Sequence, residues 1–277
     1  MKVGVIGYGH LANVATICLA SKGHQIVQWD ADPWLLRADQ PSGLTEPGAA
    51  DLATPPKVIL IAHGASQLVN CEIVWICYDT PLTALGAGDD AAVVKRVGLV
   101  REHLRPRTLV LFSSQCAIGT TAALQRLYPE LYFAAVPENI RVGKAIDDFL
   151  HQPRIVVGVP DETRNDEIEA LLFGLTPSIE YMSPESAEMS KHALNAFLAL
   201  QITFINEIDR LCQAHGADAV DVSRALLTEA RISPQAPLKP GKPFGGGSLQ
   251  RDVMTLNELS RSAGLHTPIL KAIIPSN

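Results

Sequence analysis

The chain has 277 residues, 47% of them hydrophobic and 19% charged, which is typical of a globular protein long enough for two domains with cores of their own. Its formal net charge of −6 argues against electrostatic binding of nucleic acid. It has no apolar run of about 18 residues, so we expect no membrane span.

The cysteines indicate where the protein works. There are five, an odd number, and they are scattered without the spacing of metal ligands. Free thiols of this kind suit a reducing compartment. Because Met1 and Lys2 lead directly into a predicted strand, we also expect no signal peptide. The sequence therefore predicts a cytoplasmic protein without a metal site.

The first 30 residues contain a dinucleotide-binding pattern. Residues 2–6 form a short apolar run typical of a parallel strand buried on both faces, and residues 13–21 favour a helix. Between them lie Gly7, Gly9 and Ala12 in a G-x-G-x-x-A turn. We expect Gly7 to make the tight turn, Gly9 to let the backbone approach a pyrophosphate, and Ala12 to keep helix and strand close.

The second predicted strand, residues 25–30, ends in Asp30. A carboxylate at this point of the fold accepts hydrogen bonds from both ribose hydroxyls and repels a 2′-phosphate. No Arg or Lys follows within residues 31–34 to neutralise such a phosphate. Free N–H groups are expected near His10 and Leu11, where the preceding helix begins, and they suit the pyrophosphate. The sequence therefore predicts NAD, not NADP, as the cofactor.

Beyond residue 56 the chain alternates between strands and helices. We expect strands at residues 58–62, 73–78, 108–112 and 132–136, and helices at residues 89–103 and 120–127. This alternation predicts an α/β fold with a doubly wound parallel sheet, that is, a Rossmann domain. Thr80 follows one of these strands at a carboxyl end, where such sheets bind ligands, so it is a candidate cofactor contact. A simple helix-entry turn is the alternative.

The last third of the chain is predicted to be all-helical. Ser183 and Pro184 are suited to the N-cap and first position of one long central helix that runs to about His215. This helix is apolar on much of its circumference, which favours burial in a subunit interface. Shorter helices are expected at residues 218–228, 252–263 and 268–274. We predict a Rossmann domain at residues 1–182, a helical dimerisation domain at residues 183–277, and a homodimer.

Two motifs in the helical part resemble those of a known family. Residues 189–199 read Met-Ser-Lys-His-Ala-Leu-Asn-Ala-Phe-Leu-Ala, with Lys191 and Asn195 on one helix face. Residues 244–252 read Phe-Gly-Gly-Gly-Ser-Leu-Gln-Arg-Asp and end in Asp252. They are similar to Met-Thr-Lys-Tyr-Ala-Ala-Asn-Ala-Phe-Leu-Ala and Gly-Gly-Ser-Cys-Phe-Pro-Lys-Asp of the nucleotide-sugar 6-dehydrogenases (UDP-glucose and GDP-mannose dehydrogenases). Residues 78–81, Tyr-Asp-Thr-Pro, likewise resemble that family's Val-Pro-Thr-Pro.

The resemblance implies roles for these residues. Lys191 would stabilise a developing oxyanion, Asn195 would orient the substrate hydroxyl, and Asp252 would hold a water on the base side. Arg251 would replace the family's lysine near the cofactor or substrate. Phe244, Gly245 and Gly246 would belong to the substrate loop.

The chain departs from the family at the group needed for the second oxidation. Aligned on Asp252, the family's nucleophilic cysteine falls on Ser248, whose hydroxyl is a poor nucleophile without an adjacent base. Glu138 matches a glutamate linked to thioester hydrolysis, but Val142 stands at the second glutamate and Gln115 replaces a threonine of the site. This pattern implies a single alcohol–aldehyde step. The alternative for Ser248 is any small residue in a glycine-rich bend.

The resemblance leaves the substrate open. The family has a further C-terminal domain that holds much of the nucleotide, and we expect it to be absent here. We expect an NAD-dependent dehydrogenase acting on the CH–OH group of a small molecule, with a nucleotide sugar as the family's substrate. One alternative is a β-hydroxyacid-dehydrogenase-like enzyme, for whose carboxylated substrate Arg141, Arg231 and Arg251 are candidate anchors. The other is a non-catalytic NAD-binding subunit that dimerises through the long helix.

Overall fold

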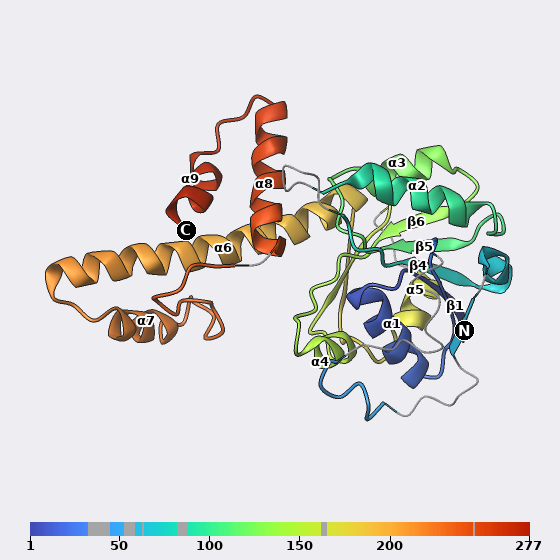
Figure 1. Ribbon diagram of the computed structural model, residues 1–277, viewed down its shortest axis with the longest axis horizontal. Helices are drawn as coiled ribbons and strands as arrows, with labels where there is room; N and C mark the ends of the chain where they lie inside the picture. Colours follow the sequence, from blue (N-terminus) through green and yellow to red (C-terminus); the bar gives the residue numbers. More distant parts are fainter. Residues whose placement is uncertain (33–44, 53–58, 63, 82–87, 162–164, 246) are drawn as a thin grey trace. The chain divides into compact units, whose positions relative to one another are not determined.

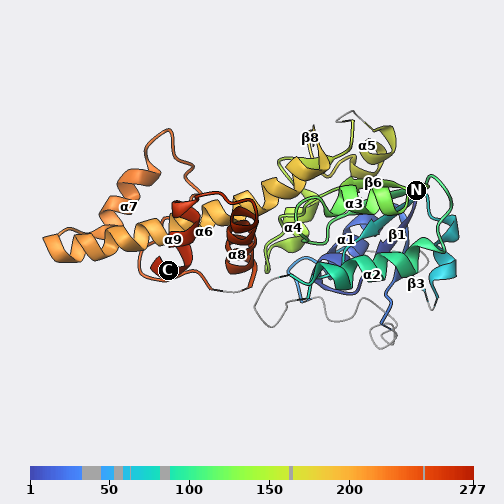
Figure 2. The same ribbon diagram turned by 90° about the horizontal axis from the view of Figure 1, so that it is seen from above.

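The computed structural model describes residues 1–32, 45–52, 59–62, 64–81, 88–161, 165–245 and 247–277. These residues divide into two compact units, shown in Figures 1 and 2. The first contains Met1–Thr83 and Gly88–Met189, and the described part of the second is Ser190–Asn277. The division falls inside the long helix, and the domain boundary expected after residue 182 stays a prediction.

The first unit is built on one sheet with the strand order β3-β2-β1-β4-β5-β6-β7-β8. Strands β1 to β6 are parallel, β7 is antiparallel to β6, and β8 is parallel to β7. The bounds are β1 (Lys2–Ile6), β2 (Gln25–Trp29), β3 (Ile59–Ile61), β4 (Ile73–Ile76), β5 (Leu109–Phe112), β6 (Tyr132–Ala135), β7 (Ile155–Gly158) and β8 (Ile179–Met182). The strand order reverses at β1 and β4, which confirms the predicted doubly wound α/β fold.

Side-chain alternation along the strands builds two core layers. Val3, Val5 and Trp75 pack in one layer with α1, α4 and α5, whereas Ile6 and Val74 pack in the other with η2, α2 and α3. The helices are α1 (His10–Ser21), η2 (Ala65–Asn70), α2 (Asp90–Arg101), α3 (Thr120–Leu127), α4 (Ala145–Leu150) and α5 (Asp166–Leu172). Because both faces of the strands are covered, β1, β4 and β5 are nearly continuous apolar runs.

Four elements between residues 145 and 182 were not indicated by the sequence. They are α4, β7, α5 and β8, with 6, 4, 7 and 4 residues. Segments this short contain too few residues for a helical or strand period to register. The strands β7 and β8 extend the sheet beyond β6, which was the last strand that the sequence predicted.

The second unit contains most of α6 (Pro184–His215), with α7 (Ala219–Leu227), α8 (Gly247–Ser262) and α9 (Pro268–Ser276). Helix α6 stops at Gly216, whose φ of 72° favours glycine. Helix α8 begins at Gly247, earlier than the predicted Asp252, because glycine's low helix propensity masked its first turn. A small core of five buried residues joins α6, α8 and α9: Ala196, Ala199, Val253, Leu256 and Ile273.

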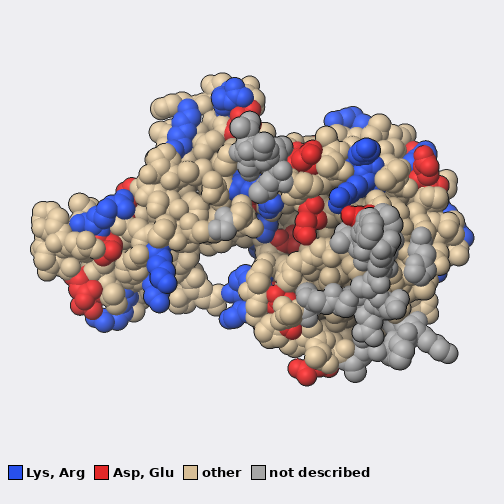
Figure 3. Space-filling view, in the orientation of Figure 1, with Lys and Arg blue, Asp and Glu red and all other residues tan. Residues whose placement is uncertain are grey.

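The surface carries charge of both signs. On the face drawn in Figure 3, the described basic and acidic side chains are interspersed and form no continuous basic patch. Among the helices of the described residues, none combines the length and apolarity needed to cross a bilayer.

Glu188 links the start of α6 to α3 within the first unit. Helix α3 follows Gly119, which has no side chain to cap it. The Glu188 carboxylate accepts the backbone N–H groups of Gly119 (2.5 Å) and Thr121 (2.8 Å) and the Thr121 hydroxyl (2.7 Å). A carboxylate at a helix N-terminus satisfies free N–H groups and opposes the helix dipole favourably. Burial raises the pKa of Glu188, which these hydrogen bonds partly offset.

We predict that Glu188→Ala lowers the free energy of unfolding of the first unit by about 1–3 kcal/mol, because it leaves partly buried donors without an acceptor. All three tryptophans of the sequence precede residue 189, so tryptophan fluorescence in urea reports on this unit. Glu185→Ala, in the same turn but exposed, is the control and should stay within about 0.5 kcal/mol. Equal stability of the two variants would contradict the capping role.

Candidate functional site

The carboxyl ends of the parallel strands gather the candidate residues of the first unit at one edge of the sheet. Gly7 follows β1, Asp30 follows β2, Thr80 follows β4, Gln115 follows β5 and Glu138 follows β6. Parallel strands with reversed order leave a crevice at this edge for a ligand. Asp30 and Thr80 lie at the strand ends where they were expected, and Gln115 and Glu138 lie at the same edge.

The turn after β1 fits a dinucleotide. Gly7 has a φ of 126°, and a Cβ on it would lie 2.9 Å from the carbonyl oxygen of Cys77 and 3.3 Å from the Cβ of Ala12. Its N–H donates to the carbonyl of Trp29 at 2.8 Å. Only glycine allows β1, β4 and α1 to approach this closely. The N-terminus of α1, at His10, is thereby brought to the carboxyl edge of the sheet.

Asp30 is held ready as an acceptor. Its side chain is buried and accepts the N–H of Asp32 at 2.9 Å. Burial raises the pKa of Asp30, while hydrogen bonds from the backbone of Asp32 and Tyr8 and the charge of Arg96 oppose that rise. Since a carboxylate has about four lone-pair sites, it retains capacity for a ribose hydroxyl.

Arg96 is a residue that the sequence did not single out. It comes from α2, and its guanidinium lies 5.0 Å from the centre of the Tyr78 ring. The Tyr78 ring is buried, and the charge of Asp30 adds to the rise that burial causes in the pKa of Tyr78. The sequence shows no basic residue directly after Asp30, but it could not show that Arg96, from another helix, lies nearby.

His10 and Leu11, at the start of α1, are both partly buried. The Nε2 of His10 lies 3.4 Å from a carboxylate oxygen of Glu46. Glu46 also accepts the N–H groups of Gly143 (2.9 Å) and Ala145 (3.1 Å), and the Gly143 bond is the main reason that its pKa lies below its ordinary value. Glu46 thus joins the start of α1 to the loop before α4.

The remaining candidates at this edge are mostly enclosed. Thr80 is buried with its hydroxyl 3.9 Å from the Cys116 sulfur, and Gln115 is partly buried. Glu138 is buried and accepts a hydrogen bond from Gln152 at 3.2 Å. Val142, which stands at the family's second glutamate, is 87% exposed.

A buried carboxylate forms the centre of the candidate site in the second unit. Asp252 on α8 has no exposed surface, and its Oδ2 accepts a hydrogen bond from the Asn195 amide of α6. Its Oδ1 lies 3.1 Å from the Nδ1 of His192 and 3.8 Å from the Nε of Arg251. Lys191 is partly buried and lies one helical turn before Asn195 on α6. The predicted residues Asn195, Asp252 and Arg251 are therefore brought together.

His192 is a member of this cluster that sequence reasoning missed. An ionised carboxylate can only accept, so the contact requires the proton of the imidazole to be on Nδ1. Both side chains are buried, so this contact helps to satisfy their polar atoms away from water. The sequence did carry one sign of this residue: it has histidine at position 192, where the similar family motif has tyrosine.

The glycine-rich loop leads into α8. Ser248 is exposed in the first turn of α8. The backbone of Phe244 is held by the side chain of Asn277, which accepts its N–H at 2.9 Å and donates to its carbonyl at 3.0 Å. Gly245 is exposed, and Gly246 lies outside the described residues.

The three arginines suggested as substrate anchors differ in their surroundings. Arg141 pairs with Asp148 through its Nε at 2.8 Å and a second nitrogen at 2.5 Å, and this bond raises its pKa. Arg231 pairs with Glu229 at 3.0 Å and is otherwise exposed. Arg251 is only 16% exposed and lies beside Asp252. A substrate carboxylate would have to replace a protein carboxylate at Arg141 and at Arg231.

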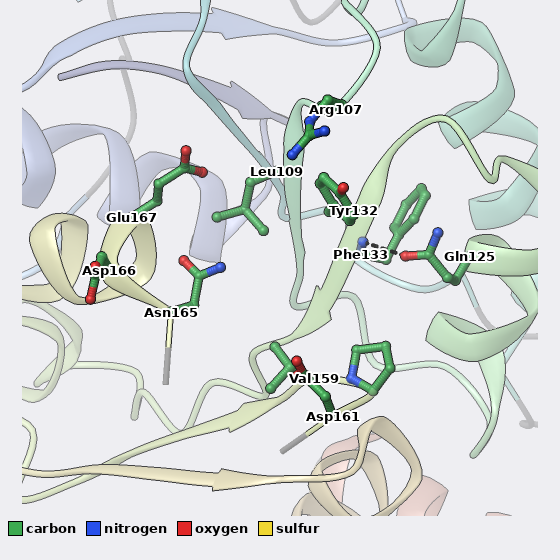
Figure 4. A pocket seen from close by; sticks show the side chains of 11 residues that line it. Arg107, Leu109, Gln125, Tyr132, Phe133, Val159, Asp161, Asn165, Asp166 and Glu167 are labelled. Carbon is green, nitrogen blue, oxygen red and sulfur yellow. Dashed lines mark hydrogen bonds between the residues drawn. The ribbon is translucent and has the colours of Figure 1, made fainter. Parts of the chain in front are cut away.

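A pocket in the first unit lies away from these residues. Figure 4 shows Arg107, Tyr132 and Asp161 around a cavity of about 650 Å³. Arg107 and Tyr132 lie at the amino ends of β5 and β6, at the opposite edge of the sheet from Asp30. The cavity contains none of the predicted site residues. Among the described residues, no group of three His, Cys, Asp or Glu side chains is placed to hold a metal ion.

Comparisons with known sequences assign both units. The NAD-binding domain of the UDP-glucose/GDP-mannose dehydrogenase family matches residues 1–174, and the central domain of that family matches residues 185–277. The UDP-glucose 6-dehydrogenase TuaD of Bacillus subtilis is 30% identical over 289 residues, which cover 100% of this chain and 62% of TuaD. The UDP-glucose 6-dehydrogenase of Pseudomonas aeruginosa is 28% identical over 298 residues, with 100% and 65% covered. The chain thus spans less than two thirds of the length of these relatives.

Solved structures agree with this assignment. A UDP-glucose dehydrogenase from Pyrobaculum islandicum has a TM-score of 0.88 and 28% identity, with 100% of this chain and 67% of that chain covered. A 3-hydroxyisobutyrate dehydrogenase from Mycobacterium tuberculosis has a TM-score of 0.71 at 18% identity, with 98% and 90% covered, and shares the fold. Because the matched domains account for nearly the whole sequence, the chain belongs to the UDP-glucose/GDP-mannose dehydrogenase family and carries its NAD-binding domain.

Proposed function

We propose that this chain is an NAD-dependent oxidoreductase that acts on a CH–OH group of a nucleotide sugar and stops after one two-electron step. The observation that carries the proposal is the buried Asp252 cluster, which retains Asn195 and Lys191 while Ser248 stands where the family has its nucleophilic cysteine. The chain keeps the groups for alcohol oxidation and lacks the thiol for aldehyde oxidation.

The first step needs a group that stabilises negative charge on the substrate oxygen. NAD, when bound, supplies the hydride acceptor. Lys191 stabilises the alkoxide that develops, and Asn195 orients the hydroxyl because its own amide is fixed by Asp252. Asp252, which stands at the family's base-side carboxylate, holds the water that receives the hydroxyl proton. Glu138 and Gln115, at the carboxyl edge of the sheet, are the further candidates within the first unit.

The second step needs a nucleophile that attacks the aldehyde. A helix N-terminus lowers the pKa of a thiol, so the first turn of α8 suits a cysteine. The same position does little for Ser248, because an alcohol is not measurably ionised near neutral pH without an adjacent base. The proposed product is therefore the aldehyde.

The proposal includes a homodimer formed through α6. Phe197, Phe204 and Leu211 repeat every seven residues on this helix and are 55%, 47% and 57% exposed, respectively. Apolar residues at heptad spacing form a stripe along a helix, as in helices that pair with a partner. A second copy of the chain offers an identical stripe, so a twofold arrangement covers both.

The thiols support a location in the cytoplasm. All five cysteines are free and buried. Burial raises the pKa of Cys18 to about 12 and that of Cys71 to about 11, so both stay protonated and inert. Free, protonated thiols of this kind are typical of proteins in a reducing compartment, where disulfides do not form.

For the cofactor, we predict that NAD binds at least about tenfold more tightly than NADP, because Asp30 repels a 2′-phosphate. Asp30→Ala should reduce this preference by about tenfold, since it leaves Arg96 nearby without its counter-charge. Adding Arg96→Ala should remove the gain in NADP affinity. Calorimetry with both nucleotides measures the effect, and equal affinities for the unmodified protein would refute it.

For catalysis, we predict one NADH per substrate with UDP-glucose or GDP-mannose, and a loss of about 10²–10³ in rate for Lys191→Ala. Ser248→Cys should add a slow second oxidation, whereas Ser262→Cys, at the exposed far end of α8, should not. NADH absorbance and product mass measure both steps. Two NADH from the unmodified protein would disprove the single-step proposal. Turnover of a hydroxy acid alone, or no turnover while NAD binds, would favour one of the two alternatives.

For assembly, we predict a dimer by light scattering at micromolar concentration. Phe197→Glu combined with Phe204→Glu should give a monomer, because like charges then oppose each other across a desolvated stripe. Val220→Glu, at a 62% exposed apolar residue of α7, is the matched control and should remain dimeric. A monomeric unmodified protein would exclude the proposed interface.

A further inference from the structure

The side chain of Asp79 lies against the glycine turn of the cofactor site. A Cβ added to Gly9 would lie 2.1 Å from the Oδ2 of Asp79 and 2.7 Å from its Cγ. Asp79 comes shortly after β4, and Gly9 directly precedes α1, so the contact joins two neighbouring strands at their carboxyl ends. Asp79 is exposed, so its carboxylate faces both solvent and the turn.

In dinucleotide-binding turns of this kind, the space next to the second glycine is occupied by the cofactor pyrophosphate. The second glycine of the pattern lacks a side chain so that the pyrophosphate of a dinucleotide can approach the backbone. Helix α1 begins there without a side-chain cap and without an acidic residue in its first turn. Its N–H groups are thus offered to an anion. In this chain the carboxylate of Asp79 already lies in that space.

We propose that Asp79 is a residue that sets dinucleotide affinity, because its carboxylate competes with the cofactor pyrophosphate for the space over Gly9. The inference rests on the cofactor site described above. The Asp79 side chain is flexible enough to turn away when the cofactor enters, but its charge stays close to two phosphate charges. For like charges about 5 Å apart at a solvent-exposed position, where the effective dielectric lies between that of a protein surface and that of bulk water, repulsion weakens binding by about tenfold.

The position also separates this chain from the motif that it resembles. Residues 78–81 read Tyr-Asp-Thr-Pro, where the similar pattern has Val-Pro-Thr-Pro. Proline brings no charge to the turn, whereas Asp79 brings one. Gly7 and Gly9 lie outside this four-residue segment, in the turn after β1. The change therefore alters the electrostatics of the site and leaves its framework in place.

The test compares Asp79→Asn, which removes the charge at equal size, with Asp79→Ala, which removes charge and volume. Calorimetry with NAD, ADP-ribose and adenosine separates the pyrophosphate from the rest of the ligand. Both variants should bind NAD and ADP-ribose about tenfold more tightly and adenosine within about twofold of the unmodified protein. Asp166→Asn, an exposed acid at the opposite edge of the sheet, is the matched control and should change none of the three affinities.

Four results would overturn the inference. Unchanged NAD affinity in both variants would show that the charge has no effect, while leaving the cofactor site intact. A gain for Asp79→Ala alone would mean that volume matters and charge does not. An equal gain for adenosine would place the effect away from the pyrophosphate. Failure of NAD to bind any of the proteins, with unchanged thermal denaturation, would refute this inference together with the proposed function.

Discussion

The turn at Gly7 is the constraint on which the cofactor end of the sheet depends. A side chain there would meet the carbonyl of Cys77, so β1 could not keep its pairing with β4, in which Ile6 lies opposite Ile76. The same glycine lets α1 pack through the buried Ala12. With β1, β4 and α1 fixed in this way, the end of β2 with Asp30 and the segment with Thr80 are brought to one edge. The electrostatics of the site then depend on which side chains these segments carry.

Buried carboxylates recur in both units, and each has hydrogen-bond partners close by. Asp30 accepts backbone N–H groups, Glu138 accepts from Gln152, and Glu188 caps α3. Asp252 accepts from Asn195 in the second unit. Burying a carboxylate without hydrogen-bond partners costs free energy, so each of these carboxylates is surrounded by donors that offset this cost. Glu188 uses this environment to fasten the start of α6, whereas Asp30 and Asp252 are the carboxylates that we propose to act toward a ligand.

The two departures from the family's motifs on which our proposals rest, Ser248 and Asp79, lie at exposed positions. Ser248 differs from a cysteine by one atom and lies exposed at the first turn of α8, so it disturbs no packing. Asp79 is also exposed and adds a charge beside Gly9 without altering the turn. A fold can therefore persist while individual side chains change its chemistry.

The sequence by itself determined the fold class, the glycine turn, Asp30 and the long helix. These features are encoded by local patterns: alternation of strands and helices, a motif of fixed spacing, and a helical period sustained from Pro184 to His215. It also placed Lys191 and Asn195 on one face, because four residues make about one helical turn. The strand order and the short elements α4, β7, α5 and β8 were decided only by tertiary structure, since their pairing partners are distant in sequence.

Contacts between distant residues were also decided by tertiary structure alone. The charge of Arg96 on α2 acts on Asp30, His192 of α6 contacts Asp252, and Asp79 lies over Gly9, and none of these pairs is close in sequence. Local patterns report on neighbours along one element, whereas charge pairing and hydrogen bonding depend on which elements pack together. Local patterns could therefore nominate individual candidate residues, such as Asp30 and Asn195, which stay predictions. The partners that tune those residues required the packed chain.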